Sequence, residues 1–504
     1  MTRLGFLLDS DSCIGCHACT VACKSEHDVP IGVNRTWVKY IETGNFPDVA
    51  RKFNVMRCNH CDDAPCMKIC PTSALFRADN GVVDFEDDNC IGCKACMNAC
   101  PYDAIYINPE TSTAHKCNFC NHRVEVGLEP SCVVVCPTQA IKVVDLDDPA
   151  DPVNRIIARD DVAVRAPEQN TKPKVYYRGA DQASLDPTRT AIAADGMIWA
   201  DTTPSHPTVP HVDHGVIART TYTTAHSMTW KEKVSGYLVT KAIAAGVMAV
   251  AALLVLLGHA DVQAAVGVVP PMIAGVFLGL TGVLLVADLK QPTRFHYLLT
   301  RGNTESWLVK GAYVLMAFSI VCALWWIGGL LDADGLLKVL AVPAVLGAAG
   351  TAGYTAFLFG QCEGRDLWQT PLLLPMLLAQ AAAAGGATYA LMDLFMDVPE
   401  PTAIRWVLLG GVAAIAALMA IELTAKSSRT VELAVWEMTR GAYAQRFWIG
   451  GVGLGVVVPA VLVIVALAAD TGPALPAVAA VSALVGLFAY EDAFVRAGQS
   501  VPLS

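Results

Sequence analysis

Eight long apolar segments fill the second half of this 504-residue chain. Each approaches or exceeds the ~20 residues that an α-helix needs to cross the hydrocarbon core of a bilayer. The segments cover residues 236–258, 264–287, 306–330, 338–359, 371–396, 402–424, 447–469 and 474–496. Because no soluble core buries so many apolar helices in so short a stretch, the sequence predicts an all-α bundle of eight transmembrane helices, and hence a multi-pass protein of the cell (inner) membrane.

The first half of the chain is polar, acidic and rich in cysteine. The net charge of −10 comes largely from blocks such as DFEDD (84–88) and DLDDPADP (145–152), and this acidic balance argues against nucleic-acid binding. Sixteen of the 18 cysteines lie between Cys13 and Cys136. The first residues have no sustained apolar run and no twin arginine, so we interpret these thiols as metal ligands rather than as the disulfide framework of a secreted domain.

The sixteen cysteines form four motifs that each begin C-x2-C and end C-x3-C. Motif one is Cys13, Cys16, Cys19 and Cys23; motif two is Cys58, Cys61, Cys66 and Cys70; motif three is Cys90, Cys93, Cys96 and Cys100; motif four is Cys117, Cys120, Cys132 and Cys136. Proline follows the last cysteine of motifs two, three and four, whereas Lys24 follows that of motif one.

The spacing of these motifs has a physical reason. Three thiolates on a tight loop wrap one face of an iron–sulfur cube, while a fourth cysteine, three residues on, has entered a helix and ligates the other cluster in two-cluster ferredoxins. Four motifs therefore predict two ferredoxin-like units and four [4Fe–4S] clusters. A single C-x2-C pair is common in zinc sites, but sixteen cysteines in four such motifs argue against zinc.

Short elements between the motifs suit the same fold. GVVDF (81–85) and AIYI (104–107) are predicted as strands and ACMNACP (95–101) as the start of a helix, in the β-α-β pattern of small ferredoxins. The predicted fold class is an α+β double ferredoxin-like iron–sulfur domain followed by the helical bundle. We divide the chain into this domain (1–145), an extended linker with scattered prolines (146–230) and a membrane anchor (231–504).

The segment from Cys13 to CPTQAI (136–141) resembles the four-cluster electron-transfer subunits of the molybdopterin oxidoreductase superfamily. That group includes the iron–sulfur subunits of dimethyl sulfoxide, polysulfide, tetrathionate and nitrate reductases and of formate dehydrogenase. The resemblance implies a crossed pairing of motif one with motif four and of motif two with motif three. In that pairing Cys23 joins motif four, Cys136 joins motif one, Cys70 joins motif three and Cys100 joins motif two.

The apolar half resembles the polysulfide-reductase (NrfD-like) membrane anchors. The matching stretches are SGYLVTKAIAAG (235–246), QPTRFHYLLTRGNTESWLVKGAYVL (291–315) and YTAFLFGQCEGRDLWQTPLL (354–373). The resemblance implies a heme-free anchor that binds quinone (menaquinone or ubiquinone) near the face where the iron–sulfur domain docks. The composition agrees with a heme-free anchor, because a diheme anchor needs pairs of histidines within its helices. This half has only two histidines, His259 and His296, and both lie at span ends.

Polar residues in or near the spans are candidates for that site, because an ionisable group in hydrocarbon is costly. The candidates for the quinone site or a proton relay are Lys241, Asp288 and Glu363, and those for quinone contact are His296, Arg301 and Trp307. The alternatives without a functional role are that the Lys241 side chain extends to the membrane interface, and that Arg301 and Lys310 bind lipid head groups. The remaining cysteines, Cys322 and Cys362, are interpreted as packing residues.

The distribution of basic residues bears on the orientation of the chain. Twelve lie on the side of the iron–sulfur domain: Lys231, Lys233, Lys290, Arg294, Arg301, Lys310, Arg365, Lys426, Arg429, Arg440, Arg446 and Arg496. Only Lys338 and Arg405 lie on the other side. The positive-inside rule therefore favours the cytoplasmic side for the iron–sulfur domain. The periplasmic side is the alternative, since relatives are exported together with a catalytic subunit.

These observations predict an electron-transfer and membrane-anchor subunit of a respiratory complex. Electrons would pass through the clusters between the membrane quinone pool and a separate molybdopterin catalytic subunit, which carries the substrate chemistry. The alternative is a module of an energy-converting, proton-translocating quinone oxidoreductase, with Lys241, Glu363 and Glu422 as a partial proton path. A third hypothesis is a passive anchor with clusters and no quinone site.

Overall fold

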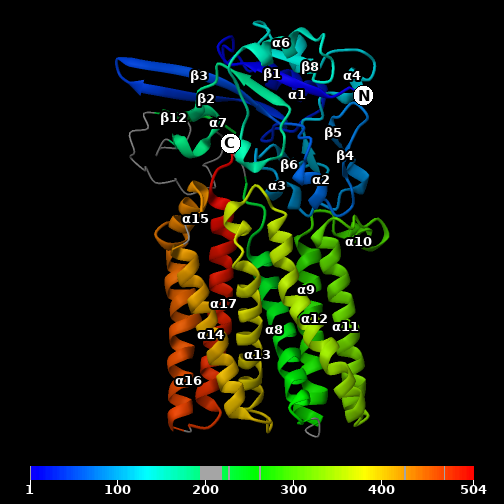
Figure 1. Ribbon diagram of the computed structural model, residues 1–504, viewed down its shortest axis with the longest axis vertical. Helices are drawn as coiled ribbons and strands as arrows, with labels where there is room; N and C mark the ends of the chain where they lie inside the picture. Colours follow the sequence, from blue (N-terminus) through cyan, green and yellow to red (C-terminus); the bar gives the residue numbers. More distant parts are fainter. Residues whose placement is uncertain (1, 193–217, 225–226, 260–262, 425–426, 470) are drawn as a thin grey trace.

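The chain folds into an α+β domain that sits on one end of a bundle of long helices (Figure 1). The computed structural model describes residues 2–192, 218–224, 227–259, 263–424, 427–469 and 471–504. The C-terminal segment after the last helix returns to the boundary between the two parts, so both the α+β domain and the end of the chain lie at the same end of the bundle.

A four-stranded sheet lies at the top of the α+β domain. Its central strand β1 (Leu4–Asp9) is antiparallel to β8 (Ile141–Asp145) and parallel to β10 (Val175–Arg178), which is paired in turn with β9 (Val162–Ala163). All six residues of β1 are buried, as expected of a continuous apolar strand with neighbours on both edges. The sheet thus joins the start of the chain to the segments that follow motif four.

A second sheet carries a long hairpin. Strands β2 (Thr36–Asn45) and β3 (Asp48–Arg57) pair along their whole length, and β2 also pairs with β12 (Ala218–Tyr222), which is followed by β11 (Ala191–Ile192). The tip of the hairpin projects away from the domain (Figure 1).

The cysteine motifs lie on short elements between these sheets. Two small hairpins, β4–β5 and β6–β7, alternate with short helices. The strands are β4 (Leu75–Arg77), β5 (Val83–Phe85), β6 (Ile105–Ile107) and β7 (Ala114–Lys116), and the helices are α1 (Ala18–Glu26), α2 (Pro65–Ile69), α3 (Ala95–Ala99), α4 (Asn121–Val124) and α5 (Ser131–Val134). The strands predicted in residues 81–85 and 104–107 and the helix predicted from residue 95 are confirmed.

The structure corrects the prediction for residues 146–230. We expected an extended linker, but the described part contains α6 (Pro152–Arg159), α7 (Gln182–Leu185) and strands of both sheets. The sequence feature that indicates a strand here is the alternation of VYYR (175–178). In the structure Val175 and Tyr177 point inward and are 0% and 1% exposed. Residues 193–217 of the predicted linker lie outside the described residues, as does Lys426.

Among the described residues, eight helices long and apolar enough to cross a membrane follow, as predicted. They are α8 (Glu232–Leu256), α9 (Val269–Asp288), α11 (Trp307–Leu330), α12 (Asp334–Gly360), α13 (Leu373–Met392), α14 (Pro401–Thr424), α16 (Val458–Ala469) and α17 (Ala474–Ser500). The π-helical segments η4 (Gln263–Val268) and η7 (Arg446–Val457) lengthen α9 and α16 at their N-termini. Two shorter helices, α10 (Tyr297–Thr300) and α15 (Arg429–Thr439), lie at the end that faces the α+β domain.

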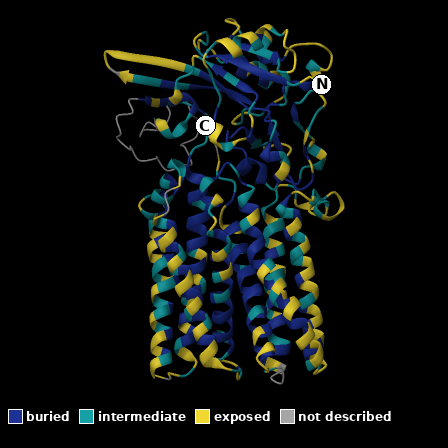
Figure 2. Cartoon of the chain, viewed as in Figure 1, coloured by how far each residue is buried: buried dark blue, intermediate teal, exposed yellow. Residues whose placement is uncertain are grey.

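Helices α8 and α13 form the centre of the bundle. They approach closely at Gly246 and Gly385, where a Cβ on either residue would lie within 2.5 Å of the other helix's backbone, which is the small-residue packing typical of membrane helices. The outward faces of the surrounding helices carry exposed apolar side chains such as Val339, Leu346 and Ile449, each more than 60% exposed (Figure 2). These faces are suited to contact with lipid.

Candidate functional site

The first two cysteines of every motif lie on a loop with the same backbone turn, and the third cysteine lies in a helix. The residue just before the second cysteine has a positive φ in all four motifs: 70° at Gly15, 44° at His60, 66° at Gly92 and 63° at Phe119. A left-handed residue at this point curls the loop, so that neighbouring thiols face the same side. The shared spacing of the motifs thus produces a shared loop conformation.

The fourth cysteine of each motif lies in a helix or within two residues of its end. Cys70 and Cys100 directly follow α2 and α3, so a proline at the next position costs no helical hydrogen bond. Cys23 differs because α1 continues to Glu26, and a proline at position 24 would break this helix. The Lys24 ammonium instead donates to the Pro30 and Val33 carbonyls, at 2.9 and 2.6 Å.

Thiols from different motifs come together in four sets. Burial raises the pKa of Cys23, and the neighbouring thiols of Cys117, Cys132 and Cys120 raise it further. The sets are the distal set (Cys13, Cys16, Cys19, Cys136), the second set (Cys23, Cys117, Cys120, Cys132), the third set (Cys58, Cys61, Cys66, Cys100) and the proximal set (Cys70, Cys90, Cys93, Cys96). Their membership is that of the crossed pairing expected above, and the ligand role of each thiol stays a prediction.

The sets fit a metal cluster in their chemistry. The four thiols of the proximal set line one small cavity of about 20 Å³. Burial raises the pKa of the Cys117 and Cys93 thiols to about 12, so a bound cation is needed to hold them as thiolates. Backbone N–H groups donate to sulfur, from Ala114 to Cys90 at 3.4 Å and from Ala140 to Cys136 at 3.2 Å, as is usual around iron–sulfur clusters.

The four sets follow one another through the domain. Thiols of adjacent sets lie near one another in three pairs: Cys19 with Cys132, Cys117 with Cys58, and Cys96 with Cys66. The distal set reaches the surface, where Cys16 is exposed, whereas every thiol of the third set is buried. The order is therefore distal, second, third and proximal, from the outer surface towards the helical bundle.

The proximal set rests on the connection between α9 and α11. The backbone N–H groups of Lys290 and Gln291 donate to the Gly92 and Ile91 carbonyls, both at 3.1 Å. A Cβ at Gly92 would lie 2.6 Å from that of Lys290, so only glycine allows this approach. Further side-chain donors hold the loops of motifs two and three: Arg294 to the Cys90 carbonyl, Asn303 to the Cys70 carbonyl and Ser306 to the Ile69 carbonyl, at 3.0, 3.0 and 2.7 Å.

An aromatic cluster joins the proximal set to the interior of the bundle. The Trp230 indole N–H donates to the Cys93 carbonyl at 3.2 Å. The Trp230 ring stacks on Phe359 and Trp368, with centroids 5.7 and 5.5 Å away. Cys362 is fully buried beside this cluster and lies near Cys93.

Lys241 lies deeper, inside the bundle, and does not snorkel. It is 1% exposed. Its ammonium donates to the Ala352 carbonyl at 2.9 Å and to the Thr355 hydroxyl, and lies 4.8 Å from the centroid of the Tyr354 ring. No carboxylate in the described part of the chain accepts a hydrogen bond from it, and a lysine at this depth is a costly arrangement that points to a function.

The structure assigns docking contacts to two other predicted site residues. Asp288 forms an ion pair with Lys94 of motif three at 2.7 Å. The Arg301 guanidinium donates to the Asn89 side chain at 2.5 Å and lies 4.7 Å from the Tyr297 ring. Both side chains therefore connect the anchor to the iron–sulfur domain, on the surface next to the proximal set.

The remaining candidates are dispersed. Trp307 stacks on Phe357 at 4.3 Å, one turn from Tyr354 on α12, so it approaches the helix face that also contacts Lys241. His296 is exposed and bonds locally to the Thr293 carbonyl. Glu363 is half-buried in the loop after α12; burial raises its pKa, and the nearby Lys68 opposes that shift.

Sequence reasoning missed a second buried polar group. Glu491 of α17 is 2% exposed, accepts from the Gln380 side chain at 2.6 Å and interacts with the charge of Lys241. Next to it, the Tyr490 hydroxyl donates to Glu422 of α14 at 3.0 Å. The available signal was an acidic residue near the end of the last predicted span.

Comparisons with known proteins divide the chain as the structure does. A 4Fe-4S dicluster domain model matches residues 49–146, and a 4Fe-4S binding domain model matches residues 10–29. The model described as polysulphide reductase, NrfD matches residues 221–502, which is more than half of the chain. The chain belongs to the NrfD family. Its N-terminal domain is an iron–sulfur domain of the [4Fe–4S] type, so the preference for iron–sulfur clusters over zinc is confirmed.

Relatives of the iron–sulfur domain include subunits of reductases. Arsenate respiratory reductase iron-sulfur subunit ArrB of a Shewanella species is 36% identical over 225 residues, 35% of this chain and 95% of that protein. Protein NrfC of Escherichia coli is 42% identical over 34% of this chain and 79% of that protein. Thiosulfate reductase electron transfer subunit PhsB of Salmonella typhi is 46% identical over 28% of this chain and 76% of that protein. This NrfD protein therefore combines an iron–sulfur domain, homologous to the electron-transfer subunits of respiratory reductases, with a multi-pass membrane anchor.

Proposed function

We propose that this chain carries electrons between a membrane quinone and a separate molybdopterin catalytic subunit, through four [4Fe–4S] clusters. The observation that carries the proposal is the unbroken order of the four thiol sets, from the exposed Cys16 to the contact of Cys93 with Trp230 and the anchor. Bound clusters supply one-electron redox chemistry. The protein holds them in sequence and brings the last one against the membrane part.

We place the quinone head group near Lys241. Its ammonium is a buried donor suited to a quinone carbonyl, and a reduced quinone also needs a group that accepts protons. Tyr354 and Phe357 of α12 present neighbouring aromatic rings to Lys241 and to Trp307. In this arrangement Asp288 and Arg301 position the proximal set, and they do not touch the quinone.

Reduction by quinol tests the proposal directly. A quinol analogue added to the purified chain should produce the paramagnetic signal of reduced [4Fe–4S] clusters, and a quinone-site inhibitor should suppress it. If dithionite produces the signal and no quinol does, the anchor is passive. The catalytic partner is tested separately, because a native complex that purifies without a molybdenum-containing large subunit contradicts that part.

The orientation we propose places the iron–sulfur domain in the cytoplasm. The bundle end that faces this domain carries the basic residues of the docking connection, such as Lys290, Arg294 and Arg301. Lys338 and Arg405 lie near the N-termini of α12 and α14, at the opposite end. The excess of positive charge on the domain side supports a cytoplasmic location, with the periplasmic side as the alternative.

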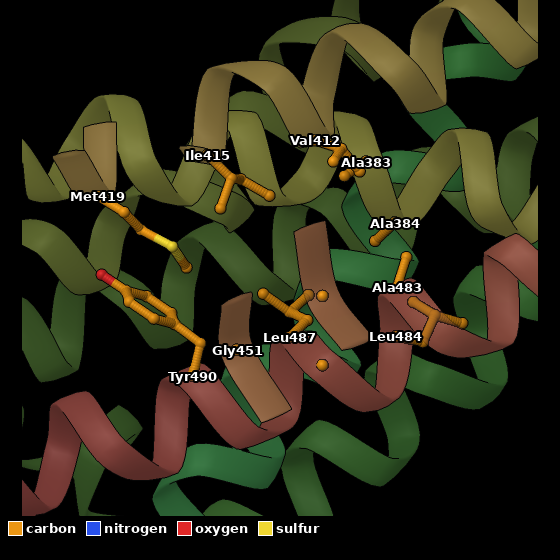
Figure 3. A pocket seen from close by; sticks show the side chains of 12 residues that line it. Ala383, Ala384, Val412, Ile415, Met419, Gly451, Ala483, Leu484, Leu487 and Tyr490 are labelled. Atoms are coloured by element: carbon orange, nitrogen blue, oxygen red, sulfur yellow. The ribbon is translucent and has the colours of Figure 1, made fainter. Parts of the chain in front are cut away.

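A second candidate function is proton translocation coupled to quinone turnover. Lys241, Glu491 and Glu422 form a buried row of ionisable groups across α8, α17 and α14. Beyond this row the Tyr490 ring borders a small apolar cavity of about 10 Å³, the space of about one water. Figure 3 shows Tyr490 and Met419 at one end of this cavity, with Ile415 and Val412 further along it.

Substitution of Glu422 separates the two functions. In a proton-translocating complex, Glu422→Gln should abolish proton release per electron while quinone-linked electron transfer continues. Glu437→Gln is the matched control, because Glu437 is also a buried carboxylate (2% exposed) but lies on α15 outside the row. Proton release measured in sealed vesicles decides: unchanged translocation in Glu422→Gln, with normal quinone turnover, contradicts the pump.

A further inference from the structure

Arg57 is a buried cation in the middle of the iron–sulfur domain. It ends β3, directly before Cys58 of the third set, and is 0% exposed. Its guanidinium carbon lies 4.3 Å from the centroid of the Phe6 ring, and Nη1 donates to the Cys132 sulfur of the second set at 3.4 Å. Arg57 therefore stands where the second and third sets meet.

This cation has no carboxylate partner among the residues that the structure describes. The groups that interact with its charge are the Cys132, Cys117 and Cys19 thiols. Its Nε and Nη2 atoms are buried and have no hydrogen-bond partner in the described part of the protein. A buried charge without a counter-charge is strongly destabilising, so the negative charge that balances Arg57 belongs at the thiols and at what they bind.

Other buried basic residues nearby are satisfied differently. Arg165, 2% exposed, donates to the Tyr102 and Leu503 carbonyls. Lys116 donates to the Val83 and Cys117 carbonyls. Arg35 also interacts with the charge of Cys23, but it donates to the His115 and Asn118 side chains. Arg57 differs from these residues because its guanidinium donates to a cysteine sulfur.

We propose that Arg57 raises the reduction potential of the cluster held by the second set. The proposal rests on the proposed function, in which Cys23, Cys117, Cys120 and Cys132 hold a [4Fe–4S] cluster. When such a cluster accepts one electron from its neighbour in the sequence of sets, it gains one negative charge and no bond is broken. A fixed positive charge and an N–H donor at its sulfur stabilise that reduced form, and net charge and hydrogen bonds to sulfur are main determinants of the potential.

The position gives the effect a consequence for electron transfer. The second set lies between the distal set and the third set, so every electron that crosses the domain passes it. With Arg57 in place, this cluster holds an electron more readily than it would alone. Arg57 thus acts through its fixed positive charge and its hydrogen bond to Cys132, and it does not itself take up an electron.

The test is a redox titration of the full-length, cluster-loaded chain, followed by electron paramagnetic resonance. Arg57→Gln should lower the midpoint potential of the second-set cluster most, with a smaller change at the distal cluster, because Arg57 also interacts with Cys19. Arg57→Lys, which keeps the charge, should lower the potential of the second-set cluster by less. A Cys120→Ser variant identifies the affected signal as that of the second set. Arg165→Gln removes a buried arginine that donates to backbone carbonyls and not to a cysteine sulfur, and it should change the potential of the second-set cluster far less.

Each outcome decides between the possibilities. An unchanged potential in Arg57→Gln overturns the inference. If Arg57→Gln loses the second cluster, Arg57→Lys carries the test. A lowered potential in Arg57→Lys supports the inference, and a wild-type potential overturns the part assigned to the hydrogen bond from the guanidinium to Cys132. If the wild-type chain itself contains no [4Fe–4S] clusters, the proposed function fails, and the two failures are distinguished by the iron content.

Discussion

Replacement of Cys23 by alanine should remove the cluster of the second set and leave the distal cluster in place. Cys23 belongs to motif one in the sequence, but its thiol lies among Cys117, Cys132 and Cys120. Without it, that cluster has three thiolates and loses a corner ligand. About a quarter of the iron should be lost if the cluster does not assemble, and electron transfer through the domain should stop because the second set precedes the third.

The matched control is Cys19→Ala, one helical turn earlier on α1. Cys19 interacts with Cys13 of the distal set, so this variant should lose the distal cluster instead. Electron paramagnetic resonance of the two reduced variants, with iron counted per chain, distinguishes them. A loss confined to the distal cluster in Cys23→Ala would refute the crossed grouping.

Replacement of Lys241 by methionine should nearly abolish reduction of the clusters by quinol. Methionine keeps the length and apolar bulk of the side chain but removes the donor that we assign to the quinone carbonyl. The loss of one positioned donor at a charged transition state commonly costs about 10²- to 10³-fold in rate. Reduction by dithionite should be unchanged, because the thiol sets lie in the other domain.

Lys310→Met is the control for the loss of a positive charge near Trp307, outside the buried position of Lys241. Lys310 is exposed and lies 4.8 Å from the centroid of the Trp307 ring, so its loss should change the rate by less than about tenfold. The measurement is the rate of cluster reduction after mixing with quinol, at equal iron content. An unaffected rate in Lys241→Met, or an equal loss in Lys310→Met, would reject Lys241 as the quinone contact.

The docking of the two domains shows why part of the site escaped prediction. Asp288, Arg301 and Lys241 are all ionisable residues in or near a predicted membrane span. The sequence alone therefore gives no reason to prefer one of them as the functional residue. Lys94 and Asn89, the partners of Asp288 and Arg301, lie about 200 residues earlier in the chain. Only the folded structure distinguishes a charge that holds a neighbouring domain from one that lies inside the bundle.

Residues 146–230 show a different limit. Scattered prolines and polar residues indicate irregular chain, and the short strands β9, β10 and β12 are too brief for periodicity to outweigh them. Their positions depend on pairing with strand edges elsewhere in the chain: β10 pairs with β1, β9 with β10, and β12 with β2. Pairing with a distant strand edge is a tertiary property that local composition does not contain.

Spacing and length determined the parts of this protein that depend on local geometry. Four motifs with a shared cysteine spacing predict iron–sulfur clusters, and eight apolar runs predict eight spans, because each signal is complete within a short continuous stretch of chain. The tertiary structure decided which sets of thiols meet, where each charge finds its partner and why Lys24 replaces proline after Cys23. The reason is that α1 continues past Cys23 and carries its thiol to motif four, a contact between residues more than ninety positions apart.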